Sequence, residues 1–493
     1  MLYPLSARGG MVTAPHHLAA QAGVAILREG GNAVEATVAA AATIAVVYPH
    51  MNGIGGDGFW LIAELGCAPV AVQACGASAG LASLAYYREH GDTAIPTRGP
   101  RAALTVAGAV GGWTAALDVA APWGKPLPLA HLLGDAIRHA RDDVPVTRSQ
   151  VALMHSKWPE LKAVPGFAET FTANGLPTLG AFQRQPRLAA TFEQLARAGF
   201  DDFYRGDLAR SMAGDLEAVG SPLRLADLER YRAALVERLA VELAAGRIYN
   251  HPPPTQGVAS LAILAIFERL GVADGESFAH IHGLIEATKR AFIWRNAEVG
   301  DPSRMRADPH DFLAPASLAR EAAAIDRQRA APWPPLAAPG DTVWLGAADR
   351  HGRVVSYIQS IYWEFGSGVV LPASGINWQN RGASFTLRDG PNVLQPQTLP
   401  FHTLNPALAR LRDGRTLAYG TMGGEGQPQT QAAFFTRHVL YGQNLQQAIT
   451  APRWLLGARI RPCSSSKRAF PPPSSISCAP PATRCRKSVP TKT

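Results

Sequence analysis

Apolar residues follow two different patterns near the start of the chain. They recur at helical spacing over residues 18–28, whereas residues 33–47 are almost entirely Ala, Val, Thr and Ile. The second pattern predicts a helix that is buried on every side, and Asn32 followed by Glu35 predicts a capping box at its start. A glycine-rich loop then leads into residues 59–63, an apolar run that is typical of a buried strand.

The middle of the chain, from about residue 110 to residue 330, carries a mainly helical pattern. Amphipathic spacing within it predicts helices at residues 188–198, 206–218 and 278–294. No segment recurs at a fixed period along the sequence, so we do not expect a repeat architecture.

Residues 325–341 break the helical pattern. They contain a group of turn-forming residues, namely Pro332, Pro334, Pro335, Pro339 and Gly340. This composition predicts an exposed, irregular linker. Two strand-like runs follow at once, residues 342–348 and 354–360, and the polar residues between them predict a hairpin. A further strand over residues 415–419 leads to a glycine pair and then to a helix near residues 428–440.

The amino-acid composition indicates the class of protein, and the charged residues are unevenly distributed along the chain. The chain has 493 residues, 47% of them hydrophobic and 17% charged, which predicts a globular protein with a large core. Its net charge of +9 is concentrated in residues 458–493, which hold eight Lys or Arg residues and no acidic residue. The remainder is almost neutral, which argues against a nucleic-acid partner. The same end is rich in Pro and Ser, and we interpret it as an aberrant tail that is disordered or translated out of frame.

The cysteines indicate whether the protein binds a metal or cofactor, and the apolar runs indicate its cellular location. The five cysteines show neither zinc-type spacing nor the density of a disulfide framework, so we expect no metal and no cofactor. The N-terminal residues lack the apolar segment of a secretory signal. The longest apolar stretch, residues 36–47, is too short to span a bilayer. These features predict a soluble cytoplasmic protein without a membrane partner.

Thr342 stands where the proline-rich linker meets the first strand of the hairpin. If the bond between Asp341 and Thr342 is cut, a hydroxyl and a new α-amino group share one residue. An α-amine has a pKa of about 8, so it can act as the base for that hydroxyl without help from a histidine. The same hydroxyl can make the cut by attacking the Asp341 carbonyl. Taken alone, however, the pattern favours an ordinary threonine at the start of a strand.

Several motifs in a fixed order instead favour Thr342 as a nucleophile over an ordinary threonine. They are residues 30–36, Pro49, residues 53–58, residues 340–342, residues 365–369, Pro406, Gly423 with Gly424, and residues 451–453. Over about residues 8–457 they make the chain resemble the gamma-glutamyltransferase family of N-terminal-nucleophile hydrolases. Thr342 stands at the position of the family's nucleophile.

This resemblance implies a fold and a maturation step. The fold is a four-layer αββα sandwich of the mixed α/β (α+β) class. The family is made as a proenzyme, which implies a cut between Asp341 and Thr342, a large subunit of residues 1–341 and a small catalytic subunit of residues 342–457. The two fragments are expected to stay together as a heterodimer, which could dimerise further.

The resemblance also implies roles for three residues beside the nucleophile. Ser360 matches a second hydroxyl, normally a threonine, that hydrogen-bonds the nucleophile. Gly423 and Gly424 match a glycine pair whose backbone N–H groups form the oxyanion hole, where glycine lets the chain approach the tetrahedral oxygen closely. The alternatives are a packed strand serine at position 360 and a simple turn at the glycine pair.

The sequence departs from the glutamyl-transferring members where they grip an amino acid. Ala74 stands near the position of the arginine that holds the α-carboxylate, and Ser384 stands at the aspartate that holds the α-ammonium. Alanine cannot make a charge-assisted contact with a carboxylate, and serine brings no charge. His402 and Thr403 replace a pair of serines, and Tyr362 replaces an asparagine. We therefore predict that the glutamyl clamp is absent.

Three other segments are similar instead to the branch of the family that contains oxamate amidohydrolase. They are residues 357–368, 378–382 and 401–406. Oxamate is a small flat molecule with one carboxylate beside one amide, and its hydrolysis gives oxalate and ammonia. Such a substrate needs a grip on its anion but no partner for an ammonium, which agrees with the loss of the aspartate.

Our candidates for this anion grip are Arg381 and His402, with Thr403 and Tyr362 as hydrogen-bond donors. A guanidinium can face a carboxylate with two parallel hydrogen bonds. The alternative for Arg381 is a solvated surface arginine, and His402 fits a structural histidine equally well. Tyr362 and Trp363 are bulky and should narrow the pocket in favour of a short substrate.

Two local motifs point elsewhere. Residues 53–58 match a GxGxxG pattern, but a dinucleotide site requires a strand before it and a helix after it, and the order here is reversed. Residues 76–80 match the GxSxG pattern of serine hydrolases, with Ser78 as nucleophile and a strand over residues 70–74 before it. Ser78 therefore remains a second candidate nucleophile.

Two further alternatives concern the same reaction centre. The chain could be a gamma-glutamyl hydrolase or transferase, or an acylase of the cephalosporin type. It could also be an inactive, uncut precursor, because the unusual residues 458–493 replace the terminal strands expected from the family and would leave sheet edges exposed.

Overall fold

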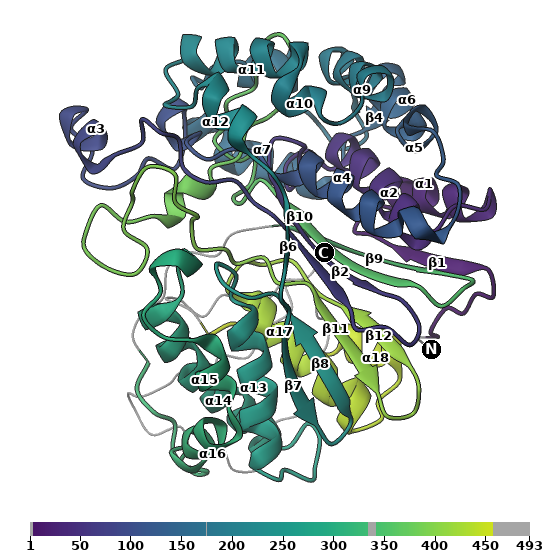
Figure 1. The fold of residues 1–493 in the computed structure, drawn as a ribbon, viewed down its shortest axis with the longest axis vertical. Coiled ribbons are helices and arrows are strands. Elements are labelled where there is room, and N and C mark those ends of the chain that lie inside the picture. Colours follow the sequence, from purple (N-terminus) through teal and green to yellow (C-terminus); the bar gives the residue numbers. More distant parts are fainter. Residues whose placement is uncertain (1–2, 174, 334–341, 457–493) are drawn as a thin grey trace.

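The computed structural model describes residues 3–173, 175–333 and 342–456 of the chain. Within these ranges the strands form two large antiparallel sheets that face one another, and helices cover the outer face of each sheet (Figure 1). The predicted four-layer αββα sandwich is therefore confirmed. Residues 458–493, interpreted as an aberrant tail, and Asp341, on one side of the expected cut, lie outside the described residues.

The first sheet carries the hairpin that begins after Thr342. Its strand order is β1-β9-β10-β2-β3-β6, with every neighbouring pair antiparallel. The bounds are β1 (Gly10–Thr13), β9 (Val343–Asp349), β10 (Val354–Ser360), β2 (Asp57–Ala63), β3 (Val70–Ala74) and β6 (Ala234–Val236). The predicted hairpin and the predicted strand after the glycine loop are thus confirmed, and they pair with each other through β10 and β2.

The second sheet packs face to face against the first. Its strands lie in the order β12 (Thr416–Tyr419), β11 (Ala407–Leu411), β8 (Gly246–Asn250) and β7 (Leu239–Leu243). Apolar side chains of both sheets form one buried cluster, with Leu61 and Ala71 from the first and Tyr249 and Leu408 from the second. This contact holds the two halves of the sandwich together.

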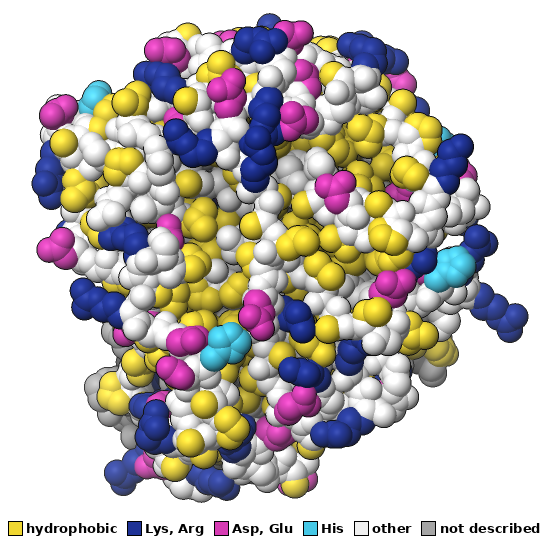
Figure 2. All heavy atoms as spheres, in the orientation of Figure 1, with side chains coloured by type: hydrophobic (Ala, Val, Ile, Leu, Met, Phe, Trp, Pro, Cys, Tyr) yellow, Lys and Arg dark blue, Asp and Glu magenta, His cyan; other side chains and the backbone are white. Residues whose placement is uncertain are grey.

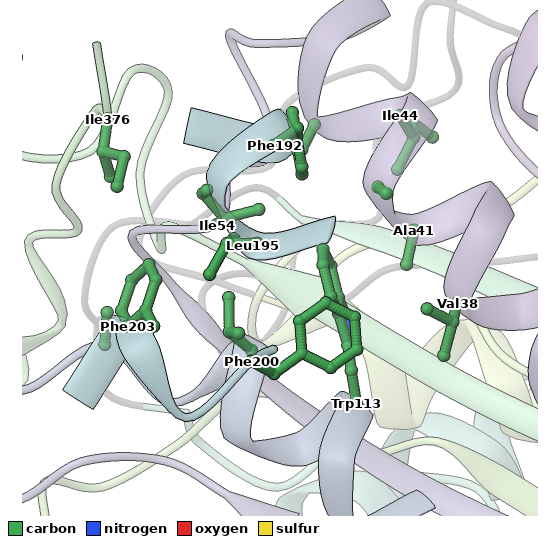
Figure 3. Packing of buried hydrophobic residues seen from close by; sticks show 14 of the residues in the cluster. Val38, Ala41, Ile44, Ile54, Trp113, Phe192, Leu195, Phe200, Phe203 and Ile376 are labelled. Carbon is green, nitrogen blue, oxygen red and sulfur yellow. The ribbon is translucent and has the colours of Figure 1, made fainter. Parts of the chain in front are cut away.

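One helix layer covers the outer face of the first sheet. It contains α1 (His17–Arg28), α2 (Ala33–Val47), α4 (Ala109–Ala120), α6 (Gly134–Asp142) and α9 (Pro186–Ala198). All of α2 is buried, as its uniformly apolar sequence predicts, and it packs on β9 and β10. Figure 3 shows Val38, Ala41 and Ile44 of α2 beside Trp113 of α4 and the aromatic rings of the neighbouring segments.

The predicted capping box at the start of α2 is present. The Asn32 side chain accepts hydrogen bonds from the backbone N–H groups of Val34 (2.9 Å) and Glu35 (3.0 Å). The Glu35 carboxylate accepts from the N–H of Asn32 at 2.8 Å and from the N–H of Leu127 at 2.7 Å. The buried helix therefore begins with its free N–H groups satisfied, which a buried helix end requires.

The second helix layer covers the other sheet. It contains α13 (Gly257–Arg269), α14 (Phe278–Glu298), α16 (Pro315–Ala323) and α17 (Gly426–Phe435). The remaining α-helices are α3 (Leu84–Glu89), α5 (Leu129–Leu132), α7 (Arg148–Leu161), α8 (Phe167–Phe171), α10 (Asp202–Arg205), α11 (Asp207–Ala218), α12 (Leu225–Arg230), α15 (Pro309–Leu313) and α18 (Leu445–Thr450). A small separate pair of strands, β4 (Val144–Pro145) and β5 (Phe182–Gln183), completes the fold.

One sequence expectation is confirmed with an addition, and another needs correction. The region from about 110 to 330 is mainly helical, as predicted, and α9, α11 and α14 match its three predicted helices, but β6, β7 and β8 cross it between residues 234 and 250. Those residues include Ala, Leu, Glu and Arg, which favour helices locally, and pairing of β8 with the distant β11 overrides that preference. The helix expected near 428–440 begins at Gly426 and ends at Phe435, where a π-helical turn, Thr436–Leu440, continues the chain.

Charge and hydrophobicity at the surface are mixed. On the face shown in Figure 2, basic and acidic side chains alternate around its edge, and hydrophobic side chains are visible where the upper and lower groups of helices meet. In the part of the chain that the structure describes, no helix combines the length and apolarity needed to cross a membrane.

Replacing Asn32 by alanine should destabilise the folded protein by about 1 kcal/mol, because the N–H groups at the buried start of α2 lose their acceptor. The measurement is the free energy of unfolding in denaturant. Ser83→Ala is the matched control, since Ser83 caps the peripheral helix α3 in the same way. An Asn32→Ala effect no larger than that of Ser83→Ala would contradict the structural importance of this cap.

Candidate active site

Thr342 lies at the open end of the β9–β10 hairpin. Its side chain is buried, with 1% of its surface exposed, and its Oγ1 donates a hydrogen bond to the backbone carbonyl of Gln359 at 2.9 Å. Val343 pairs with Gln359 in the hairpin, so the same register extended by one residue sets Thr342 opposite Ser360. The structure therefore brings together the expected nucleophile and the expected second hydroxyl.

Ser360 connects this end of the hairpin to the next turn. Its hydroxyl accepts a hydrogen bond from the backbone N–H of Tyr362 at 2.8 Å. Tyr362 has a positive φ of 81°, a conformation that costs a non-glycine residue roughly 1–3 kcal/mol. The Ser360 bond thus helps to hold Tyr362 in a strained position beside the hairpin.

The glycine loop before β2 closes on Ser360 from the other side. A Cβ added to Gly56 would lie 2.1 Å from the Ser360 carbonyl oxygen, a distance that no side chain can accept. The loop stands between α2 and β2, the reverse of a dinucleotide site. Its glycines therefore permit close backbone packing against the end of β10.

Gly423 and Gly424 form the turn between β12 and α17. Both have positive φ, 108° and 51°, and Gly424 is buried. The chain just before them runs against β9, because a Cβ on Gly420 would lie 2.2 Å from Cδ1 of Trp344. The segment that enters the glycine turn thus lies against the second residue of β9, and an oxyanion hole for Thr342 at this turn stays a prediction.

A buried chain of polar contacts supports the glycine turn, and we did not anticipate it from the sequence. The Gln256 side-chain amide donates to the carbonyls of Gly424 at 2.8 Å and Thr403 at 2.6 Å. Arg295 donates to the oxygen of the same amide at 2.7 Å and lies 3.4 Å from the carboxylate of Glu425. The helical pattern around Arg295 gave no sign that this residue points into the core.

Arg381 is the centre of the expected anion grip. It is 1% exposed, so the alternative of a solvated surface arginine is wrong. Its guanidinium lies 3.7 Å from the centre of the Tyr362 ring, and its Nη1 is 3.5 Å from the Thr403 hydroxyl. Burial lowers the pKa of Arg381 to about 10, which leaves it charged at neutral pH. Tyr362 and Thr403, two of the proposed grip residues, therefore lie against the buried positive charge of a third, Arg381.

Asp57, the first residue of β2, is the site residue that we did not select from the sequence. It is fully buried, and one carboxylate oxygen, Oδ1, accepts hydrogen bonds from the N–H groups of Gly76 (3.3 Å) and Gly108 (3.0 Å) and from the Gln379 amide (3.1 Å). Among the described residues the other oxygen, Oδ2, has no hydrogen-bond partner. The signal in the sequence that could have identified Asp57 was a single carboxylate at the start of an apolar strand.

The environment of Asp57 sets its charge. Burial raises the pKa of Asp57 to about 7, and the nearby Arg381 and the bonds to Oδ1 partly oppose this shift. Two other groups face it: the Cys75 thiol, whose pKa burial raises well above its usual value, and the His402 ring. Asp57 is therefore the group near Arg381 whose charge changes around neutral pH.

His402 lies beside Asp57, with its Nε2 3.3 Å from Asp57 Oδ2, and its ring meets the Phe59 ring edge to face at 4.9 Å. In the described part of the chain neither ring nitrogen has a hydrogen-bond partner. Burial, together with the charge of Arg381, lowers the pKa of His402 well below its usual value, so the ring is neutral. It can offer a substrate an N–H group but no positive charge.

Ser78 does not have the surroundings of a nucleophile. Its hydroxyl donates to the Gln395 carbonyl at 2.5 Å and accepts from the N–H of Thr398 at 3.1 Å. The strand β3 precedes it, but the next helix, α3, begins only at Leu84. A nucleophile elbow needs a sharp strand-to-helix turn, so Ser78 is a structural residue.

Of the two positions expected for the glutamyl clamp, Ala74 is buried on β3, next to Cys75 and thus close to Arg381. The Ser384 hydroxyl is buried and has no hydrogen-bond partner among the residues that the structure describes.

Within the same residues, no group of three or more His, Cys, Asp or Glu side chains could hold a metal ion. The site thus combines a buried hydroxyl, a glycine turn and one buried cation, an arrangement suited to attack on an amide that carries an anion.

Comparison with known proteins agrees with this arrangement. Residues 19–465 match the gamma-glutamyltranspeptidase family. The chain is 53% identical over 452 residues to the oxamate amidohydrolase proenzyme of Klebsiella pneumoniae, covering 91% of this chain and 85% of that protein. It is 38% identical over 453 residues to the glutathione hydrolase-like YwrD proenzyme of Bacillus subtilis, covering 91% and 85%.

A solved structure shares the fold. The crystal structure of cephalosporin acylase from Bacillus halodurans superposes with a TM-score of 0.84 at 32% identity, covering 92% of this chain and 85% of that one. The resemblance inferred from the sequence motifs is therefore confirmed over most of the chain.

Asp57 should make the binding of an anionic amide depend on pH. Its pKa of about 7 means that it is mostly neutral at pH 6 and ionised at pH 8, where its charge opposes the pull of Arg381 on the substrate anion. We expect KM to rise about tenfold between these pH values, as for roughly 1.4 kcal/mol of lost attraction.

In Asp57→Asn this rise in KM should disappear, because asparagine does not titrate. Asp227→Asn is the matched control, since Asp227 is a buried carboxylate that accepts two backbone N–H groups away from Arg381. A pH dependence that survives in Asp57→Asn would show that another group controls anion binding.

Proposed function

We infer that this chain, which belongs to the gamma-glutamyltranspeptidase family and hydrolyses amide bonds, cuts itself before Thr342 and then uses Thr342 as its nucleophile. The observation that supports this most directly is the buried Thr342 hydroxyl at the open end of the hairpin, opposite Ser360. Self-cleavage gives a large subunit of residues 1–341 and a small one that begins at Thr342. The two stay associated, because strands from both belong to each sheet.

The cut is an acyl shift followed by hydrolysis. The Thr342 oxygen attacks the Asp341 carbonyl carbon, the bond from that carbon to the Thr342 nitrogen breaks, and the nitrogen takes up the hydroxyl proton. The result is an ester and a free α-amine. Water then opens the ester, which returns the Thr342 hydroxyl and leaves Asp341 as a new carboxylate terminus.

Turnover repeats this chemistry on a substrate. The α-amine takes the hydroxyl proton as the Thr342 oxygen attacks the amide carbon, and the N–H groups of Gly423 and Gly424 stabilise the negative oxygen of the tetrahedral intermediate. The leaving nitrogen takes the proton and departs as ammonia. Water then hydrolyses the acyl ester and releases the acid.

We propose oxamate as the substrate, with oxalate and ammonia as products. The supporting observations are the 53% identical relative named for this reaction and the buried cation Arg381, which lies against Tyr362 and Thr403. The Tyr362 ring covers one face of that cation and restricts the space around it. Ser384 offers no charge to an ammonium, which disfavours a glutamyl substrate.

A cephalosporin-type acyl group is the second candidate, because the structural neighbour with a TM-score of 0.84 is named for that activity. Asp57, Thr403 and His402 would line either substrate's anion site together with Arg381. A cytoplasmic location and further pairing of the processed heterodimers stay predictions.

Thr342→Ala should abolish both self-cleavage and turnover, whereas Thr342→Ser should keep part of each, because the hydroxyl and the amine survive. Denaturing electrophoresis and N-terminal sequencing of the purified protein measure the cut. We expect a fragment that begins Thr-Val-Trp-Leu. A single uncut chain without activity would support the inactive precursor instead, and a cut that persists in Thr342→Ala would exclude Thr342 as the attacking residue.

Arg381→Ala should raise KM for oxamate roughly 10- to 100-fold, the effect of losing a hydrogen bond to a charged group. The neutral ethyl ester of oxamate is the control substrate, because it keeps the amide and lacks the negative charge. Ammonia release is measured with both compounds, and nitroanilide release from a glutamyl substrate tests the transferase alternative. An equal rise in KM for oxamate and its ester would remove Arg381 from the carboxylate role.

A further inference from the structure

The segment that leads toward Thr342 is attached to one helix, α14, at successive points. The His282 ring nitrogen Nε2 lies 2.8 Å from the Asp326 carbonyl. Further along the helix, Lys289 donates to the Ala331 carbonyl at 2.6 Å, and the Ala331 N–H donates to Glu286 at 3.2 Å. Both backbone polar groups of Ala331 are therefore bound by side chains of α14.

These helix residues share one face and define a direction. Positions 282, 286 and 289 follow the i, i+4, i+7 spacing of a single helical stripe. The contacts advance along this stripe as residues 326–333 advance, and Trp333 reaches the level of Phe292, with their ring centres 6.4 Å apart. The segment thus runs along α14 toward the C-terminal end of the helix.

The same end of α14 supports the active site from its inner face. Arg295, near the end of the helix, holds Gln256, and Gln256 holds the carbonyl of Gly424. One rigid element therefore carries the approaching linker on one side and the glycine turn on the other.

Glu286 and Lys289, which bind Ala331, form an ion pair that is almost completely buried. Lys289 is 1% and Glu286 3% exposed, and their charged groups lie 2.6 Å apart. Removing two charges from water costs several kcal/mol per ion, and such pairs often contribute nothing to stability compared with apolar residues. The reaction at Thr342 does not use either residue, so their role must lie in what they hold.

We propose that Glu286 and Lys289 are positioning residues for self-cleavage, which fix residues 326–333 on α14 and thereby present the bond before Thr342 to the Thr342 hydroxyl. The proposal rests on the proposed self-cleavage. Ala331 stands eleven residues before Thr342, so its two hydrogen bonds fix the position and direction of the chain on the way to that bond. A fixed approach favours the attack, because less orientational freedom has to be lost before the carbonyl meets the hydroxyl.

Two variants test the proposal by different routes. Glu286→Gln combined with Lys289→Met removes both charges, so that neither is left buried without a partner. Ala331→Pro removes the N–H that Glu286 binds and leaves the ion pair in place. Pro332 already favours an extended conformation at position 331, a conformation that proline can adopt. Arg290→Met is the matched control, since Arg290 lies on α14 at a more exposed position and pairs with Glu321 of α16.

The measurement is the fraction of full-length chain cut over time after synthesis, followed on a denaturing gel. The midpoint of thermal unfolding and the ammonia released per cut chain are measured in parallel. We expect both test variants to be cut at least about threefold more slowly than wild type, because the bond is held less precisely against the hydroxyl. Their activity per cut chain should equal that of wild type, and Arg290→Met should be cut at the wild-type rate.

Three results would overturn the proposal. Cutting of both test variants at the wild-type rate would refute the positioning role and leave the proposed function intact. Slower cutting together with a lower unfolding midpoint and lower activity per cut chain would show a general structural role instead. A wild-type chain that stays uncut, as Thr342→Ala does, would refute the proposed function itself. If the double variant does not fold, Ala331→Pro alone decides.

Discussion

The pairing of β9 with β10 is the constraint on which the rest of the site depends. Thr342 precedes β9 and Ser360 ends β10, so the hairpin register alone sets the two hydroxyls opposite one another. The hairpin lies in the middle of its sheet, between β1 and β2, and the wholly buried α2 packs on it. Glycines on both sides, at positions 56 and 420, let neighbouring backbone approach where a side chain would not fit. The nucleophile is therefore placed by rigid elements rather than by a loop, which favours precise geometry.

Electrostatics near this hairpin follow from burial. Arg381, Asp57 and His402 are almost completely inaccessible to water, and each responds in the direction that reduces its charge: the pKa of Asp57 rises, and those of the two bases fall. Only Arg381 keeps its charge throughout the neutral range. A substrate anion that enters would meet one cation, a neutral histidine and a carboxyl group that is only partly ionised. Such surroundings attract one negative charge and offer little to a second charge of opposite sign.

Both parts of the chain contribute strands to each sheet. The large sheet combines β1, β2, β3 and β6 from before Thr342 with β9 and β10 from after it, and the second sheet is divided in the same way. A cut before Thr342 would therefore separate no folded unit from another, which agrees with maturation after folding. Helix α14 contacts the linker on one face and supports the glycine turn through Arg295 and Gln256 on another. The region that prepares the cut is thus physically continuous with the region that stabilises the reaction.

The sequence by itself determined the local features: the capped apolar helix after Asn32, the hairpin after the linker, and the ordered motifs that single out Thr342, Ser360 and the glycine pair. Local periodicity and short-range hydrogen bonding dictate these local features, so they can be predicted without knowledge of the fold. The sequence could not show that Arg381 is buried against Tyr362, that Asp57 lies between Gly76, Gly108 and His402, or that residues 239–250 form strands. It also could not show that Lys289 binds Ala331. Each of these depends on segments far apart in the chain, and only tertiary packing decides which buried charges meet and how much water is removed from them.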